Sequence, residues 1–213
     1  MVKINKELKF PIIYKNAKVI GYGGNQEWFT GSWQRKAGCA STSGANLAAY
    51  YASNYRDMID LYQGDKDSFI WEEYLHAMEE MYAYMTPGPM GFPYVKRYAK
   101  QFKKFCEDKG ISLEPCIMEH VKSTKEAYEF VKWNIHNNIP VALLILHHRA
   151  EELREDNWHW VTITGYEEDE NRMEHANLIL SNCGMRQVVK MSMLFEVHPK
   201  NTIRMVSFIK KTE

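Results

Sequence analysis

The stretch VALLILHHRAEELREDNWHWVTITGY, residues 141–166, decides the fold class. It opens with VALLIL (141–146), a continuous apolar run that is typical of a buried strand. It ends with HWVTITGY (159–166), where β-branched residues alternate with others, and this pattern also predicts a strand. Helical patterns precede the stretch and more strand patterns follow it. This order predicts an α+β fold, because a nucleotide-binding sheet would alternate strands and helices.

Four helices are predicted on the N-terminal side of this stretch, from apolar residues at helical spacing. They cover residues 39–53, 68–85, 94–109 and 123–137. The last helix has a start signal, because Ser123 is a good N-cap and Glu126 follows three residues later. TPGPMGFP (86–93) separates two of the helices, since proline and glycine interrupt helical structure. This segment is interpreted either as a cleft wall or as a plain linker.

Three more strands are predicted on the C-terminal side. They are NLILSN (177–182), QVVKMSM (187–193) and TIRMVSFIKK (202–211). The links at 167–176 and 182–186 suit antiparallel hairpins. A mostly antiparallel sheet is therefore expected.

The chain is expected to form one domain over residues 1–213. Residues 1–38 are rich in turn signals and are predicted to be mainly loop. A helical lobe over about 39–138 would pack on a β lobe over about 139–213.

Composition excludes several classes of protein. The chain has 213 residues, and its 27 Lys and Arg balance 27 Asp and Glu. Nucleic acid is not expected as a partner, because proteins that bind it usually carry a basic excess. No apolar run is long enough to span a membrane, and the N-terminus lacks the apolar core of a signal peptide. We therefore expect a cytoplasmic protein with no membrane partner; the sequence carries no signal for an oligomeric state.

No motif for a cofactor or a metal ion is found in the sequence. GxGxxG, GxxxxGK[ST] and GxSxG do not occur, which argues against dinucleotide, phosphate-loop and serine-elbow sites. His147 and His148 are adjacent on a predicted strand, so their side chains would point in opposite directions. No cofactor and no metal ion are expected.

Cys39 is the candidate nucleophile. The pair Gly38-Cys39 joins a glycine-rich loop to the predicted helix over 39–53. A helix N-terminus carries a partial positive charge and unpaired N–H groups, which favour a thiolate over a thiol. The same N–H groups can stabilise the oxyanion that forms when a thiolate attacks a carbonyl. The alternative is a buried structural cysteine at a packed helix start.

His159 and Asn182 could supply the acid–base chemistry that a thiol nucleophile needs. His159 begins the predicted strand over 159–166, between Trp158 and Trp160, and could direct its imidazole into a cleft. An antiparallel hairpin would return Asn182 close to it. The amide oxygen of Asn182 is expected to accept the Nδ1–H of His159 and to fix the ring. Taken alone, each residue also has a plain structural interpretation.

The order Cys39, His159, Asn182 resembles that of the papain-like cysteine peptidases. More narrowly, the chain is similar to the bacterial bacteriocin-processing branch, the double-glycine leader peptidases. The similarity is carried by WQRKAGCASTSGANLAAYYA (33–52), HWVTITGY (159–166) and LSNCGMRQVVKMSMLFE (180–196). These pieces total about 45 residues, and they follow the family's order along nearly the whole chain.

The resemblance implies a papain-like fold and a role for each residue. Cys39 would be the nucleophile, His159 the general acid and base, and Asn182 the orienting residue. The family also uses a glutamine upstream of the cysteine as an oxyanion-hole donor. Gln26, within GGNQEWF, is slightly favoured for this role, and Gln34, five residues before Cys39, is the alternative.

The chain departs from the family pattern in two places. It reads GCAST where relatives commonly read GCGPT or GCG, so that Ala40 replaces a glycine. The gap between His159 and Asn182 is also longer than in papain, as if the hairpin 167–176 had grown. The expected function is a thiol hydrolase, a cysteine peptidase that cleaves an amide bond of a peptide or amide substrate. The alternatives are an amidase or acyl transferase with the same triad, or a catalytically silent protein that binds a peptide.

Overall fold

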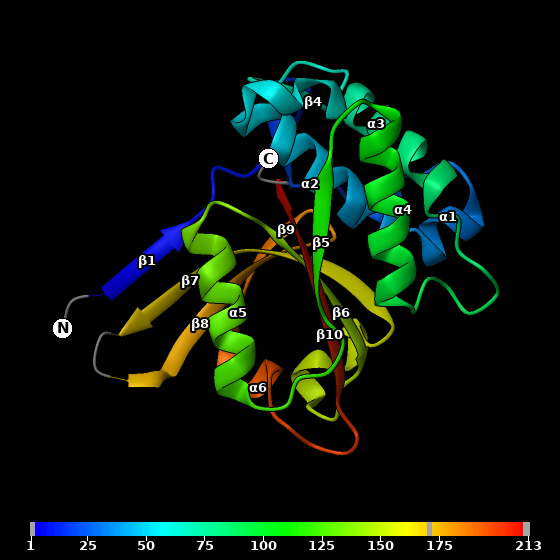
Figure 1. Ribbon diagram of the computed structural model, residues 1–213. Helices are drawn as coiled ribbons and strands as arrows, with labels where there is room; N and C mark the ends of the chain where they lie inside the picture. Colours follow the sequence, from blue (N-terminus) through cyan, green and yellow to red (C-terminus); the bar gives the residue numbers. More distant parts are fainter. Residues whose placement is uncertain (1–2, 170–171, 211–213) are drawn as a thin grey trace.

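A large antiparallel sheet organises the computed structural model, which describes residues 3–169 and 172–210. Its strand order is β5-β10-β6-β7-β8-β9, and β1 pairs with the later part of β7. The strands are β1 (Lys3–Glu7), β5 (Leu113–Met118), β6 (Val141–His147), β7 (His159–Asp169), β8 (Arg172–Asn182), β9 (Met185–Lys190) and β10 (Thr202–Lys210). Figure 1 shows β10, in red, running through the middle of the molecule.

The helices are α1 (Ser32–Ala37), α2 (Cys39–Asn54), α3 (Trp71–Tyr84), α4 (Val95–Asp108), α5 (Thr124–His136) and α6 (Met191–Leu194). The four predicted helices, α2 to α5, begin and end within a few residues of the predicted positions, whereas α1 and α6 were not predicted. The predicted cap of α5 is confirmed, because the Glu126 backbone N–H donates to Ser123 Oγ at 3.1 Å. Helices α1 to α4 gather at one end of the molecule, and α5 lies against the sheet (Figure 1).

The prediction that residues 1–38 are mainly loop was wrong. They contain β1, α1 and a hairpin of β2 (Ile12–Lys15) and β3 (Lys18–Tyr22), which forms a small sheet with β4 (Phe69–Ile70). The two residues between β2 and β3, Asn16 and Ala17, have φ values of 50° and 61°. Positive φ at both positions is the geometry of a type I′ hairpin turn.

Three boundaries in the C-terminal half also differ from the predictions. The segment 187–193 is a strand only as far as Lys190, and α6 follows it. Much of the link at 167–176 belongs to β7 and β8, which extend to Asp169 and from Arg172. Strand β5 lies inside the range that was expected to be helical. The predicted division near residue 138 therefore does not separate helices from strands.

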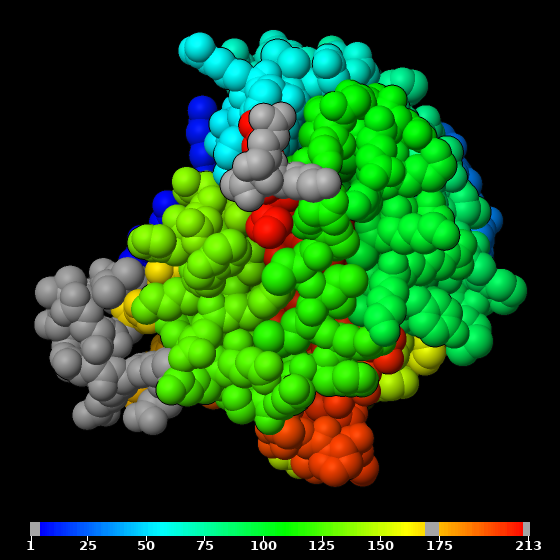
Figure 2. All heavy atoms as spheres, in the orientation of Figure 1, coloured from blue at the N-terminus to red at the C-terminus, as the bar shows by residue number. Residues whose placement is uncertain are grey.

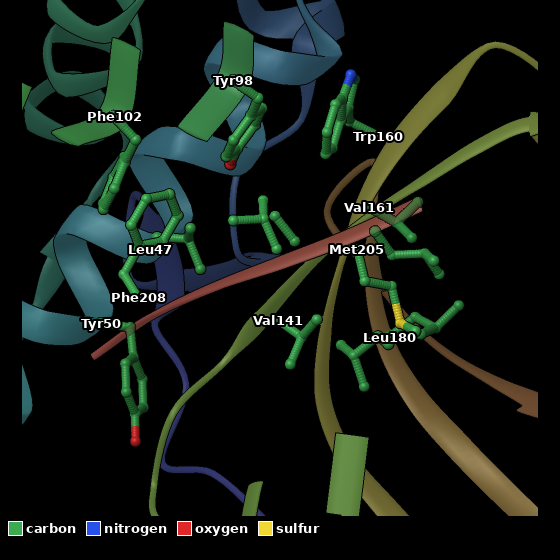
Figure 3. Close-up of a cluster of buried hydrophobic side chains, with 14 of the residues drawn as sticks. Leu47, Tyr50, Tyr98, Phe102, Val141, Trp160, Val161, Leu180, Met205 and Phe208 are labelled. Carbon is green, nitrogen blue, oxygen red and sulfur yellow. The ribbon is translucent and has the colours of Figure 1, made fainter. Parts of the chain in front are cut away.

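Helix α2 is buried along most of its length between α3 and the large sheet. Small side chains permit this, and at Gly44 an added Cβ would lie 2.9 Å from Met81 Cγ. Figure 3 shows the apolar cluster in which Leu47 of α2 meets Phe102 of α4 and Phe208 of β10. The α+β class is confirmed, and α2 is held at a fixed place against the sheet.

The C-terminal strand is enclosed by its neighbours. In Figure 2 the red atoms of this segment are visible in a seam between yellow-green and green parts of the chain. This agrees with the place of β10 between β5 and β6 in the sheet. In the described ranges, no helix combines the length and the apolar character that crossing a membrane requires.

Candidate active site

Cys39 is the first residue of α2, and a glycine places it there. Gly38 joins α1 to α2, and a Cβ at this position would lie 2.4 Å from the Gln34 carbonyl oxygen and 2.6 Å from the Phe29 ring. Both distances are shorter than a real Cβ contact, so the junction needs a glycine. The junction leaves the Cys39 side chain 7% exposed.

The hairpin of β7 and β8 brings His159 and Asn182 together. The strands are antiparallel, with Thr162 opposite Ser181, so the start of β7 lies beside the end of β8. His159 Nε2 and Asn182 Oδ1 are 2.9 Å apart. The prediction that Nδ1 makes this contact was wrong, because the rotamer of the ring turns Nε2 toward Asn182. The Cys39 thiol and the imidazole also interact, and each shifts the pKa of the other.

Two residues that sequence reasoning missed hold Asn182 from its other side. Asn182 Nδ2 donates to Asp156 Oδ1 at 2.8 Å and to Gln187 Oε1 at 2.9 Å. Asp156 lies in an acidic run that resembles a solvated surface, and Gln187 lies in β9. Neither has a sequence signal of its own, since the contacts depend on how three elements meet.

Cys183 is a third residue that the sequence did not single out as functional. It forms the turn between β8 and β9 with Gly184, and the φ values of the two are 46° and 76°. Positive φ at both positions is again type I′ geometry, and it is unusual for a cysteine. The turn places Cys183 Sγ 3.5 Å from His159 Nε2. The imidazole therefore contacts two thiols.

The surroundings of Cys39 favour its thiolate. Burial by itself raises the pKa of the thiol, because it removes water from the charged form. The hydrogen bond to His159 and the charge of its ring lower the pKa, as do N–H groups of Trp160 and Ala40. The net result is a pKa of Cys39 below its ordinary value.

The surroundings of His159 favour its protonated form. Burial by itself lowers the pKa of the imidazole. Hydrogen bonds and charge interactions with Cys183 and Cys39 raise the pKa by more than burial lowers it. The net pKa of His159 lies well above its ordinary value. The two shifts have the directions that favour a thiolate–imidazolium pair of Cys39 and His159.

A cleft of about 460 Å³ opens onto this pair. Its lining combines α1, the segment 86–93 and the loop before β7. The residues are Gln26, Trp33, Lys36, Ala37, Cys39, Met90, Gly91, Phe92, Glu155, Asn157, Trp158 and His159. The interpretation of residues 86–93 as a cleft wall is therefore the better one.

The wall made by residues 86–93 is fixed to the sheet. Trp160 Nε1 donates to the Phe92 carbonyl oxygen at 2.7 Å, and Arg204 Nη1 donates to the Pro93 carbonyl oxygen at 3.0 Å. The guanidinium of Arg97 lies 4.6 Å from the centre of the Phe92 ring. The wall is thus held by the residue that follows His159 along β7.

The structure brings Gln26, and not Gln34, to the site. Gln26 lines the cleft together with Cys39, and its Nε2 donates to the Arg35 carbonyl oxygen at 2.7 Å. Gln26 Oε1 is buried and has no hydrogen-bond partner among the described residues. Gln34 instead accepts the Gly31 N–H at 2.9 Å, within the first turn of α1. The favoured assignment of the glutamine agrees with this placement.

Ala40, the departure from the family pattern next to Cys39, does not narrow the cleft. It is fully buried and packs in the core, so its methyl group points away from the cleft lining. Within the described ranges, no three His, Cys, Asp or Glu side chains are grouped as they would be around a metal ion.

Comparison with known proteins adds no family to this geometry. No family model matches the chain, and no curated protein sequence matches it.

Proposed function

We propose that this protein is a thiol hydrolase that cleaves an amide bond, with a peptide as the expected substrate. The observation that supports this function is that Cys39 and His159 line one cleft and shift each other's pKa, while Asn182 is hydrogen-bonded to His159. A helix that presents a cysteine to an antiparallel sheet with a histidine and an asparagine also fits a papain-like arrangement.

In the first half of the reaction, the Cys39 thiolate attacks the substrate carbonyl carbon. The C–N bond breaks, and the His159 imidazolium gives its proton to the leaving amine. Asn182 keeps the ring in place, because its Oδ1 contacts Nε2, and we assign the proton transfer to the other nitrogen, Nδ1. In the second half, neutral His159 takes a proton from water, and the water attacks the thioester. The acid is released and Cys39 is regenerated.

Two donors are available for the oxyanion that forms in each half. One is the backbone N–H of Cys39 at the start of α2, and the other is Gln26 Nε2. That nitrogen carries two hydrogens, and one is used by the Arg35 carbonyl oxygen. The second is the one that we assign to the oxyanion. Loss of one such donor typically costs about 10² to 10³ in kcat.

A library of peptides and amides, incubated with the wild type and with Cys39→Ala, tests this function. We expect release of amine from some members by the wild type, and a loss of about 10³-fold or more with Cys39→Ala. Mass spectrometry of a quenched reaction should also show the acyl group on Cys39. Binding of a peptide without turnover, equal in both proteins, would instead identify a catalytically silent peptide-binding protein.

A further inference from the structure

We propose that Asp156 is a positioning residue of this site, which orients the Asn182 amide toward His159 and supplies a negative charge behind it. The inference rests on the proposed function, because it concerns the same histidine. It assigns a role to a carboxylate that neither the sequence pattern nor the resemblance singled out.

The hydrogen bonds of the Asn182 amide permit only one orientation. Both contacts of Nδ2 are to acceptors, the Asp156 carboxylate at 2.8 Å and Gln187 Oε1 at 2.9 Å. A flipped amide would place its oxygen against these two oxygens and its N–H groups against the His159 N–H. Asn182 is 7% exposed, so water cannot readily replace the lost partners. Asp156 and Gln187 therefore fix which atom His159 meets.

The charge of Asp156 is directed at Asn182. Within the described ranges, no Lys or Arg lies at ion-pair distance from Asp156, and the nearby Arg154 pairs with Glu151 and Glu155. An amide between a carboxylate and an imidazolium is polarised by both, since its N–H side faces the negative group and its oxygen faces the positive one. Asp156 thus stabilises the protonated ring of His159 through Asn182.

The loop that carries Asp156 is held in place by the next residue. Asn157 Oδ1 accepts the His148 backbone N–H at 2.6 Å, and Asn157 Nδ2 donates to the Arg154 carbonyl oxygen at 3.2 Å. The titratable groups that face the His159 ring directly are Cys39 from α2 and Cys183 from the β8–β9 turn. Lys36 and Glu155 also line the cleft.

This arrangement explains why an amide, and not a carboxylate, suits position 182. An aspartate there would place its carboxylate at hydrogen-bond distance from Asp156. Two carboxylates so close cannot both ionise, and one would hold a proton. A carboxylate at 182 is therefore compatible with the site only when the charge at 156 is removed.

Four intact proteins test the proposal: the wild type, Asp156→Asn, Asn182→Asp and the double variant. The readout is the titration of the His159 imidazole by NMR, with His159→Ala to assign its signal. Asp156→Asn should lower the pKa of His159 by about half a unit to one unit, as expected for a charge lost at this range. Asn182→Asp should change the pKa of His159, and adding Asp156→Asn should bring this pKa back toward its wild-type value. Asp156 ends a short 3₁₀ helix, Glu151–Asp156. Glu152→Gln, which removes a charge from the same helix, is the matched control and should leave the pKa of His159 unchanged.

Two results would overturn the proposal. One is a His159 pKa in Asp156→Asn equal to that in Glu152→Gln. The other is an effect of Asn182→Asp that does not depend on residue 156. If Asn182→Asp fails to fold, the comparison of Asp156→Asn with Glu152→Gln still decides. Because the readout needs no substrate, a protein that titrates as expected but cleaves no amide would refute the hydrolase and leave the role of Asp156 intact.

Discussion

At the scale of single residues, the Cys39 thiol is subject to two opposing effects. Burial favours its neutral form, and the neighbouring imidazole and backbone N–H groups favour its charged form. The effects that favour the charged form prevail, and the largest of them come from His159. The reactivity of Cys39 should therefore depend on one other side chain.

Removal of that side chain should raise the pKa of Cys39. In His159→Ala, burial is opposed only by backbone N–H groups, so the thiolate forms at higher pH. Once the pKa exceeds the pH, the thiolate fraction falls about tenfold for each further unit, and the rate of alkylation by iodoacetamide near neutral pH should fall with it. Mass spectrometry of the labelled peptides, over a range of pH, gives the rate for each cysteine.

Two other cysteines serve as controls in the same samples. Cys116 is exposed and Cys106 is buried, and burial raises the pKa of both thiols. Their rates should be the same with and without His159. A Cys39 that reacts no faster than Cys116 in the wild type would contradict the thiolate–imidazolium pair.

The main residues of the site could be predicted from the sequence, but their contacts could not. Cys39 was recognisable by its place at a helix start, and the other two by their order along the chain. The side-chain rotamer of His159 decides that Nε2, and not Nδ1, contacts Asn182. That Asp156 supports Asn182 depends on where a loop crosses the end of β8. No local sequence pattern predicts either contact.

At the scale of elements, the bond between Trp160 and the segment 86–93 couples the sheet to the cleft wall. Trp160→Phe should keep most of the stacking on Tyr98, where the ring centres are 4.2 Å apart. It would remove the indole N–H that donates to the buried Phe92 carbonyl oxygen and leave that oxygen without this partner. We expect a loss of about 1–3 kcal/mol in the free energy of unfolding, measured by denaturant titration.

The matched control is Trp133→Phe. Trp133 is 54% exposed on α5, and a surface substitution of this kind usually changes stability by about 0.5 kcal/mol or less. Equal losses in the two variants would mean that the bond to Phe92 does not hold the wall.

The helices and the strands differ in how far the sequence specifies them. α2 to α5 have apolar residues at helical spacing, and α5 also has a capping serine, so they were predictable within a few residues. β1 reads KINKE and becomes a strand through pairing with β7. β5 contains Pro115 and is an edge strand of the sheet, so its pattern is weak. Strands that depend on distant partners are the ones that local patterns miss.

At the scale of the whole molecule, Glu7 connects the first strand to distant parts of the chain. Its carboxylate accepts two bonds from Arg186 of β9, both at 2.8 Å, and one from Tyr22 at 3.0 Å. The bond from Arg186 is the largest influence on the pKa of Glu7; burial opposes it and Tyr22 adds to it. The net pKa lies below its ordinary value of 4.5.

Glu7→Gln should therefore cost stability at neutral pH and little at low pH. A carboxyl group whose pKa is lowered by folding stabilises the protein above its unfolded pKa, and this contribution disappears as the pH falls through the folded pKa. Because the pair is partly exposed, we expect a difference of only about 0.5–1 kcal/mol between wild type and variant at pH 7. Chemical unfolding at neutral and acidic pH measures it, and a difference that is independent of pH would contradict the role of the charge.

The central place of β10 also has a consequence for how the protein is made. β6 ends at His147 and β5 at Met118, whereas the strand between them begins at Thr202. During synthesis, both neighbours therefore leave the ribosome well before the strand that joins them. Until then their facing backbone groups lack a partner, and open strand edges of this kind favour aggregation. The large sheet can close only after nearly all of the described chain has emerged.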